Sequence, residues 1–201
     1  KVRGAIRLQL KTFRALLVST TRPTSMYELV YGDPIYNGAT DAAKAGMGGV
    51  WFVNQEALLW REPFSMEVQQ KLVSTKNPTG TLTNSDLELA ATIAQHHILE
   101  EAGYPMAGES THNFCNNTPA VAWQTKGSTS TTQVTADLLR HAALHQRDTG
   151  HVQQFEHLAG ERNVMADDAS RLWTRTDANL LLYFNEKYPQ TKPWQMHHLS
   201  P

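Results

Sequence analysis

Residues 36–52 constrain the fold more than any other stretch, because they read as two short strands joined by a tight turn. The first strand delivers an acidic residue, Asp41, and the second begins at Gly48 and Gly49, so the stretch predicts a hairpin with a carboxylate at its rim. Because they have no side chains, the glycines at 46, 48 and 49 leave space beside the backbone, as is needed where a bulky ligand approaches. The simpler interpretation is that Asp41 caps a turn and the glycines relieve a tight hairpin.

The composition indicates a folded chain with enough apolar residues for a core. Of the 201 residues, 40% are hydrophobic and five are tryptophans. No apolar run approaches the roughly 20 residues of a membrane-spanning helix, so we expect no membrane partner. The single cysteine, Cys115, excludes an internal disulfide and a cysteine-based zinc cluster. The chain starts at Lys1 without a secretory signal, and we expect it to be part of a longer protein.

Charge is balanced overall but uneven along the chain. The 18 Lys and Arg residues face 19 Asp and Glu residues, so net charge does not favour a nucleic-acid partner. The amino-terminal segment is nevertheless basic up to its first acidic residue, Glu28. Its apolar residues recur at helical spacing: Val2, Ile6, Leu10, Phe13 and Leu17. The segment predicts an amphipathic helix that packs on the domain or on a missing neighbour rather than on nucleic acid.

Apolar periodicity and turn signals divide the rest of the chain into strands and helices. We predict strands at 35–40, 48–53, 57–61, 110–115 and 152–158, and helices at 84–98, 119–126, 132–147, 163–173 and 178–187. The proline-rich end, 189–201, is expected to be a tail. This order predicts an α/β fold with a sheet of mixed direction flanked by helices.

Polar residues lie at matching places in these elements, where the rim of the sheet would gather them. Asp41 follows the first strand, and Glu88 lies on the first main helix beside its buried stripe. Asn116 follows the fourth strand, and Asp167 lies near the start of a late helix. A carboxylate beside a buried stripe is unusual unless it has a partner, so these residues are the candidate site.

The segments around these residues resemble the ribonuclease H domain of a retroelement reverse transcriptase. The matching motifs are TDAAKAGMGGV (40–50), TNSDLELAA (83–91), NNTPAVAW (116–123) and HLAGERNVMADDASR (157–171). They cover about residues 36–173 in the family's order. The resemblance implies a ribonuclease H-like mixed sheet of five strands flanked by helices. It also implies endonucleolytic hydrolysis of the RNA strand of an RNA/DNA hybrid.

The resemblance further implies how the site would work. Two Mg²⁺ or Mn²⁺ ions would be bound by the catalytic residues Asp41, Glu88, Asn116 and Asp167, since these ions prefer hard oxygen ligands. The backbone near Ala42 and the side chain of Asn84 match positions that would contact the 2′-hydroxyl groups of the substrate. The reverse transcriptase polymerase domain of the same polyprotein would be a partner.

Position 116 departs from the family pattern, which has Asp where this chain has Asn. An amide keeps an oxygen but loses the charge, so it is a weaker partner for a hard dication. No acidic residue lies between Ser110 and Lys126 to replace it, and natural divergence and engineering both stay open as explanations. We therefore expect binding of the hybrid with slow cleavage or none.

Three segments are expected along the chain. Residues 1–34 would be a basic helix and connector from the polymerase side, 35–175 the ribonuclease H-like domain, and 176–201 a carboxyl-terminal helix and tail. The alternative function is a non-catalytic ribonuclease H-like module, from a decayed or domesticated element, that binds nucleic acid or protein. A zinc site is a weak alternative, because none of the nine histidines shows a paired spacing with acids on one helix face. We therefore interpret His157 and the other histidines as structural or surface residues.

Overall fold

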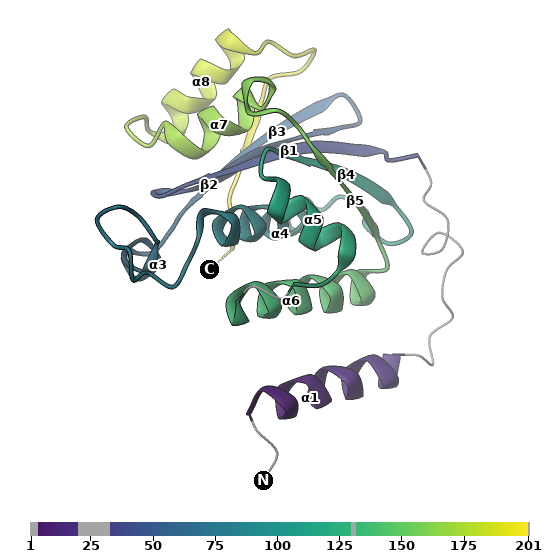
Figure 1. Cartoon of the computed structure of the whole chain (residues 1–201). Coiled ribbons are helices and arrows are strands. Elements are labelled where there is room, and N and C mark those ends of the chain that lie inside the picture. The colour runs from purple at the N-terminus through teal and green to yellow at the C-terminus, as the bar shows by residue number, and fades with distance from the viewer. Residues whose placement is uncertain (1–3, 20–32, 130–131, 201) are drawn as a thin grey trace.

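A mixed six-stranded sheet organises the chain, with helices on both of its faces (Figure 1). Figure 1 shows the computed structural model, which describes residues 4–19, 33–129 and 132–200. The strands are β1 (Tyr36–Ala43), β2 (Gly46–Val53), β3 (Glu56–Pro63), β4 (Ser110–Cys115), β5 (Val152–His157) and β6 (Gln195–His197). Their order in the sheet is β5-β4-β1-β2-β3-β6. The predicted α/β class is confirmed, with six strands in place of five.

An antiparallel meander of β1, β2 and β3 forms the centre of the sheet. Asn54 and Gln55 join β2 to β3 with positive φ angles of 48° and 70°, the left-handed geometry that a tight hairpin requires. β4 pairs with β1, and β5 with β4, in the parallel sense, which makes the sheet mixed. β1 runs further than predicted, so Asp41 lies within the strand opposite Gly48 and not at its end.

The helices form two layers. They are α1 (Gly4–Ser19), α3 (Met66–Lys71), α4 (Asn84–Glu101), α5 (Thr118–Lys126), α6 (Gln133–Thr149), α7 (Val164–Arg171) and α8 (Asp177–Lys187). Figure 1 shows α4, α5 and α6 on one side of the sheet and α7 and α8 on the other. α4 begins at a capping box in which the Thr83 side chain accepts from the Asp86 backbone and the Asp86 side chain accepts from Thr83.

Alternate residues of the central strands supply the two cores, because successive side chains of a strand point to opposite faces. Trp51 and Trp60 are buried in the core that includes Ile98 of α4. Val50 and Leu59, their neighbours in sequence, are buried with Phe184 of α8 in the core on the other face. Both faces of β2 and β3 are therefore covered, and each strand has apolar side chains on both faces.

The carboxyl-terminal segment contributes a strand that the sequence did not predict. Residues 195–197 form β6, which pairs in parallel with residues 58–60 of β3. Just before it, Trp194 is only 2% exposed and packs its ring 5.6 Å from that of Phe52 and 5.2 Å from that of Phe184. The expected tail over 189–201 thus completes one edge of the sheet, because Trp194 inserts into the core of α8.

The amino-terminal helix is present as predicted but leaves apolar side chains exposed. Along α1, Ile6, Leu10, Phe13 and Leu17 are between 49% and 68% exposed. Residues 1–3 and the connector 20–32 lie outside the described part of the chain. Within the described residues, no helix combines the length and apolar character needed to cross a bilayer.

The Gln95 side chain joins α4 to the sheet through buried hydrogen bonds. Its amide oxygen accepts from the Trp60 indole, and its amide nitrogen donates to the Val50 carbonyl at 2.8 Å. The Gln95 backbone carbonyl accepts from the Trp51 indole at 2.6 Å. A Cβ at Gly49 would lie 2.6 Å from the Gln95 amide oxygen, so this glycine makes space for the side chain.

We expect Gln95→Met to destabilise the fold. The change keeps the length of the side chain but leaves the Trp60 indole without its acceptor and removes the side-chain bond to the Val50 carbonyl, at about 1–3 kcal/mol for each lost interaction. The free energy of unfolding, measured by urea denaturation, should fall by roughly 2–5 kcal/mol. Gln70→Met, at an exposed position of α3, is the matched control and should change it little. Equal stability of both variants would contradict this account.

Candidate active site

Asp41 is the centre of the candidate site and is completely buried, with an exposure of 0%. One of its carboxylate oxygens, Oδ1, accepts a hydrogen bond from the Asn116 amide nitrogen at 3.1 Å. The other, Oδ2, accepts from the Ser170 hydroxyl at 2.5 Å and lies 3.7 Å from the Arg171 guanidinium. The charge of Asp41 is thus held by groups from the end of β4 and from α7.

Glu88 lies on α4 beside Asp41 and is also buried, with an exposure of 2%. Its Oε2 accepts from the Ala42 backbone N–H at 3.1 Å, and its Oε1 accepts from the Asn84 amide at 3.4 Å. Burial, together with the negative charge of Asp41, raises the pKa of Glu88 to about 8. The Asp41 carboxylate is therefore close enough to oppose the ionisation of Glu88.

Cys115 is a buried free cysteine beside Glu88. Its thiol points to Glu88 Oε2 at 3.8 Å, and burial beside that carboxylate raises the pKa of Cys115 to about 12.

Asp167 is the most open carboxylate of the group, with its side chain 42% exposed. It lies one helical turn before Arg171 on α7, and the two side chains form an ion pair with Nε 2.5 Å from Oδ1. Because Arg171 also reaches Asp41, its guanidinium lies between the two acids.

Glycines of β2 allow α7 to lie close enough to Asp41 to form this site. A Cβ at Gly48 would lie 2.8 Å from the backbone carbonyl carbon of Ala169, a distance that real side chains do not tolerate. A Cβ at Gly46 would lie 2.2 Å from the Trp173 ring. These glycines therefore make space for the packing of α7 and of Trp173 against β2.

The structure brings all six predicted residues into one network of contacts. Asp41, Glu88, Asn116 and Asp167 come from β1, α4, the end of β4 and α7, while Ala42 and Asn84 contact Glu88. The sequence analysis missed Ser170 and Arg171, which bind Asp41 directly. Their positions three and four residues after Asp167 were the available signal, since that spacing shares one helix face.

The donors present suit divalent cations of the Mg²⁺ type in their chemistry. They are hard oxygens, and a bound cation would offset the negative charge of Asp41 that opposes the ionisation of Glu88. Among the described residues, however, Asp41, Glu88 and Asp167 do not bring one oxygen each within 4.8 Å of the others. They are thus not spaced as three ligands of a single ion.

Comparison with solved structures reveals the same architecture elsewhere. The chain is similar to LC11-RNase H1, isolated from compost by a metagenomic approach, at 15% identity and a TM-score of 0.50, over 70% of this chain and 98% of that one. The chain therefore has the ribonuclease H-like fold. It also matches RNase H1 from the halophilic archaeon Halobacterium salinarum NRC-1, at 14% identity and a TM-score of 0.42, over 67% of this chain and 92% of that one.

A third similar structure is LC11-RNase H1 in complex with an RNA/DNA hybrid, at 18% identity and a TM-score of 0.45. It is matched over 67% of this chain and 92% of that one. No protein-family model and no curated protein matches the chain.

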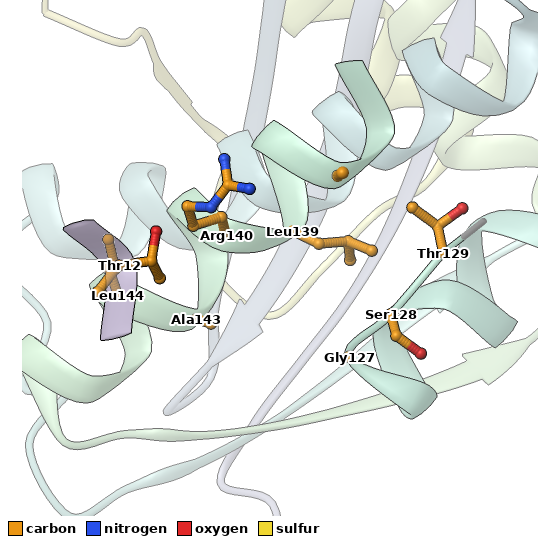
Figure 2. Close-up of a pocket in the computed structure, with 9 residues that line it drawn as sticks. Thr12, Gly127, Ser128, Thr129, Leu139, Arg140, Ala143 and Leu144 are labelled. Carbon is orange, nitrogen blue, oxygen red and sulfur yellow. The ribbon is translucent and has the colours of Figure 1, made fainter. Parts of the chain in front are cut away.

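A pocket of about 280 Å³ lies away from these residues, between α1 and α6 (Figure 2). Thr12 of α1 lines it on one side, and Leu139 and Arg140 of α6 line it on another. None of the six predicted site residues contributes to it. The candidate site is therefore separate from this pocket.

Ser170→Ala should destabilise the metal-free protein. The change removes the hydroxyl that donates to the buried Asp41 carboxylate, at a cost of about 1–3 kcal/mol. Urea unfolding in the presence of a chelator measures the effect. Ser128→Ala, at an exposed position after α5, is the control and should leave the free energy of unfolding unchanged. If both variants unfold like the parent, the Ser170 hydroxyl does not support Asp41.

Proposed function

We propose that this domain hydrolyses the RNA strand of RNA/DNA hybrids, endonucleolytically, with two Mg²⁺ or Mn²⁺ ions. The main support is that Asp41, Glu88 and Asp167, which are far apart in sequence, belong to one network of contacts in a ribonuclease H-like fold. LC11-RNase H1, which shares that fold, has been solved with an RNA/DNA hybrid. These facts support the same substrate class here.

In this proposal the acids divide the work according to their surroundings. Asp41 would contact both ions, because its orientation is held by Ser170 and Asn116. Asp167, the more exposed acid, would hold the ion on the side of the attacking water, while Glu88 and Asn116 would support the other or position water. When bound, the ions would make water nucleophilic and stabilise the leaving oxygen.

Substrate contacts would come from the start of α4 and from β1. Asn84 lies one turn before Glu88, and its amide now donates to that carboxylate. The same amide could donate to a 2′-hydroxyl group, which distinguishes RNA from DNA. The backbone at Ala42 lies beside Glu88, so both predicted contacts are adjacent to the acids.

Asn116 is the reason to expect weak activity. Its amide donates to Asp41, which a carboxylate at that position could not do when ionised. Arg171 further neutralises Asp41 and Asp167. These contacts satisfy the acids without an ion, and they favour the alternative of a non-catalytic module that binds nucleic acid or protein.

The wider context is proposed from the motif resemblance. The domain would belong to a retroelement reverse transcriptase polyprotein, with 1–34 leading from the polymerase domain and 35–175 as the ribonuclease H-like part. Residues 176–201 would follow as its carboxyl-terminal segment. The exposed apolar side chains of α1 are consistent with a neighbour such as the polymerase domain.

We expect Asn116→Asp to cleave a labelled RNA/DNA hybrid faster than the parent chain in Mg²⁺. A carboxylate restores the charge that a hard dication prefers, and about tenfold or more is expected if catalysis is limited by this ligand. Asp41→Asn in the Asn116→Asp background is the control and should abolish the gain. Equal rates for the parent and Asn116→Asp would discard the claim of impairment. A lack of cleavage by both would favour the binding module.

The same substitution should make stability depend on Mg²⁺. In a chelator, Asn116→Asp loses the hydrogen bond to Asp41 and adds a like charge, so unfolding should cost about 1–3 kcal/mol less than in the parent. Millimolar Mg²⁺ should restore more stability to this variant than to the parent. Asn179→Asp, exposed on α8, is the control. An identical Mg²⁺ response of parent and Asn116→Asp would argue against metal binding at this site.

A further inference from the structure

A second cluster of ligand-type side chains lies between α4 and α6, apart from the candidate active site. α4 contributes His97 and Glu100, and α6 contributes His141 and His145. The spacings of three and four residues place each pair on one helix face. His97 and Glu100 correct the sequence analysis, which recognised no histidine paired with an acid in this way.

The distances within the cluster are those of a metal site that needs little rearrangement. Glu100 Oε2 lies 2.8 Å from His145 Nε2 and 3.6 Å from His97 Nδ1. One ligand atom from each of these residues lies within 4.8 Å of the others. Tetrahedral Zn²⁺ with ligands at about 2.0–2.1 Å separates neighbouring ligand atoms by roughly 3.3 Å. The measured separations bracket that value.

A second contact between α4 and α6 lies beside the pair of Glu100 and His145. His97 Nε2 faces His141 Nε2 at 3.2 Å, and neither residue is an acid. Two charged imidazoles would repel at this distance, whereas neutral imidazoles are metal ligands.

The surroundings hold the cluster in place without competing for it. Leu89 and Ile93 of α4 pack with Leu139 of α6 in one core, so the two helices have a defined spacing. Two further histidines, His96 and His151, lie next to the cluster and already have hydrogen-bond partners in the protein. His96 Nδ1 contacts the Thr92 carbonyl at 2.9 Å, and His151 Nδ1 contacts the Thr149 hydroxyl at 2.8 Å.

We propose that His97, Glu100 and His145 bind a Zn²⁺ ion on the surface between α4 and α6. Imidazole ligands suit zinc and its borderline neighbours rather than Mg²⁺. Glu100 is twelve residues after Glu88 on α4, about 18 Å along the helix axis. The site is therefore separate from the candidate active site, and the proposal does not rest on the proposed function.

The expected role of the ion is to fasten α6 to α4. Two ligands come from α4 and one from α6, so a bound ion would link elements that otherwise meet through apolar packing. Binding to the folded state alone stabilises it by mass action. Zinc should therefore raise the unfolding temperature of the protein even when Asp41 is replaced by Asn.

The test is a titration of the whole chain, freed of metal by a chelator and dialysed, with ZnCl₂ in a calorimeter. To keep zinc from the acidic site, it is carried out in an Asp41→Asn background. One ion per chain is expected. His145→Ala and Glu100→Gln should each weaken binding by about tenfold or more. Substitution with Co²⁺ should give the visible absorption of a tetrahedral centre in the background protein and lose it in both variants.

His112→Ala is the matched control. His112 also contacts an acid, Glu156, at 3.2 Å, but this contact joins one histidine and one acid and includes no further histidine. It should bind zinc like the background protein. Glu100→Gln keeps hydrogen-bonding capacity on an exposed side chain, so it remains informative if His145→Ala fails to fold, as checked by circular dichroism. No zinc uptake by the background protein, unchanged uptake in the folded variants, or an equal loss in His112→Ala would each overturn the proposal.

Discussion

The close approach of α7 to β2 is the packing constraint on which the candidate site depends. Gly48 has no side chain, and the backbone of Ala169 fills the space that a Cβ would take. Because of this contact, Ser170 and Arg171 reach the buried Asp41 on the neighbouring strand. A larger residue at position 48 would push the helix outward, and with it the late acid, Asp167. The geometry of the candidate site therefore depends on how closely the backbones of α7 and β2 pack.

Around Asp41, negative charge is gathered and then balanced by protein groups. Glu88 is buried next to Asp41, and its pKa rises to about 8 for that reason. Arg171, Ser170 and Asn116 supply a positive charge and two hydrogen bonds to Asp41. Such a site has two ways to lower its electrostatic free energy, either through these donors or through added cations. Asn116 favours the first way, since its amide donates where an ionised carboxylate could not.

α4 links the two groups of polar residues described in the structure. Its amino-terminal part carries Asn84 and Glu88, which offer hard oxygens near the sheet. Its carboxyl-terminal part carries His97 and Glu100, which face α6 and offer imidazole as well as carboxylate. The buried side chain of Gln95, between them, holds the helix to β2 and β3. One rigid helix therefore presents donor sets of different hardness at its two ends.

The sequence by itself determined the order of β1 to β5 and of α4 to α8, and it placed Asp41, Glu88, Asn116 and Asp167 together through motifs 40–50, 83–91, 116–123 and 157–171. Local periodicity and turn residues act within short windows, so they can be read without a structure. Only the tertiary structure decided that β6 joins β3, that Gly48 serves α7, and that His97 meets His145. These depend on which surfaces pack together, and short-range patterns do not encode the distance between residues on separate elements.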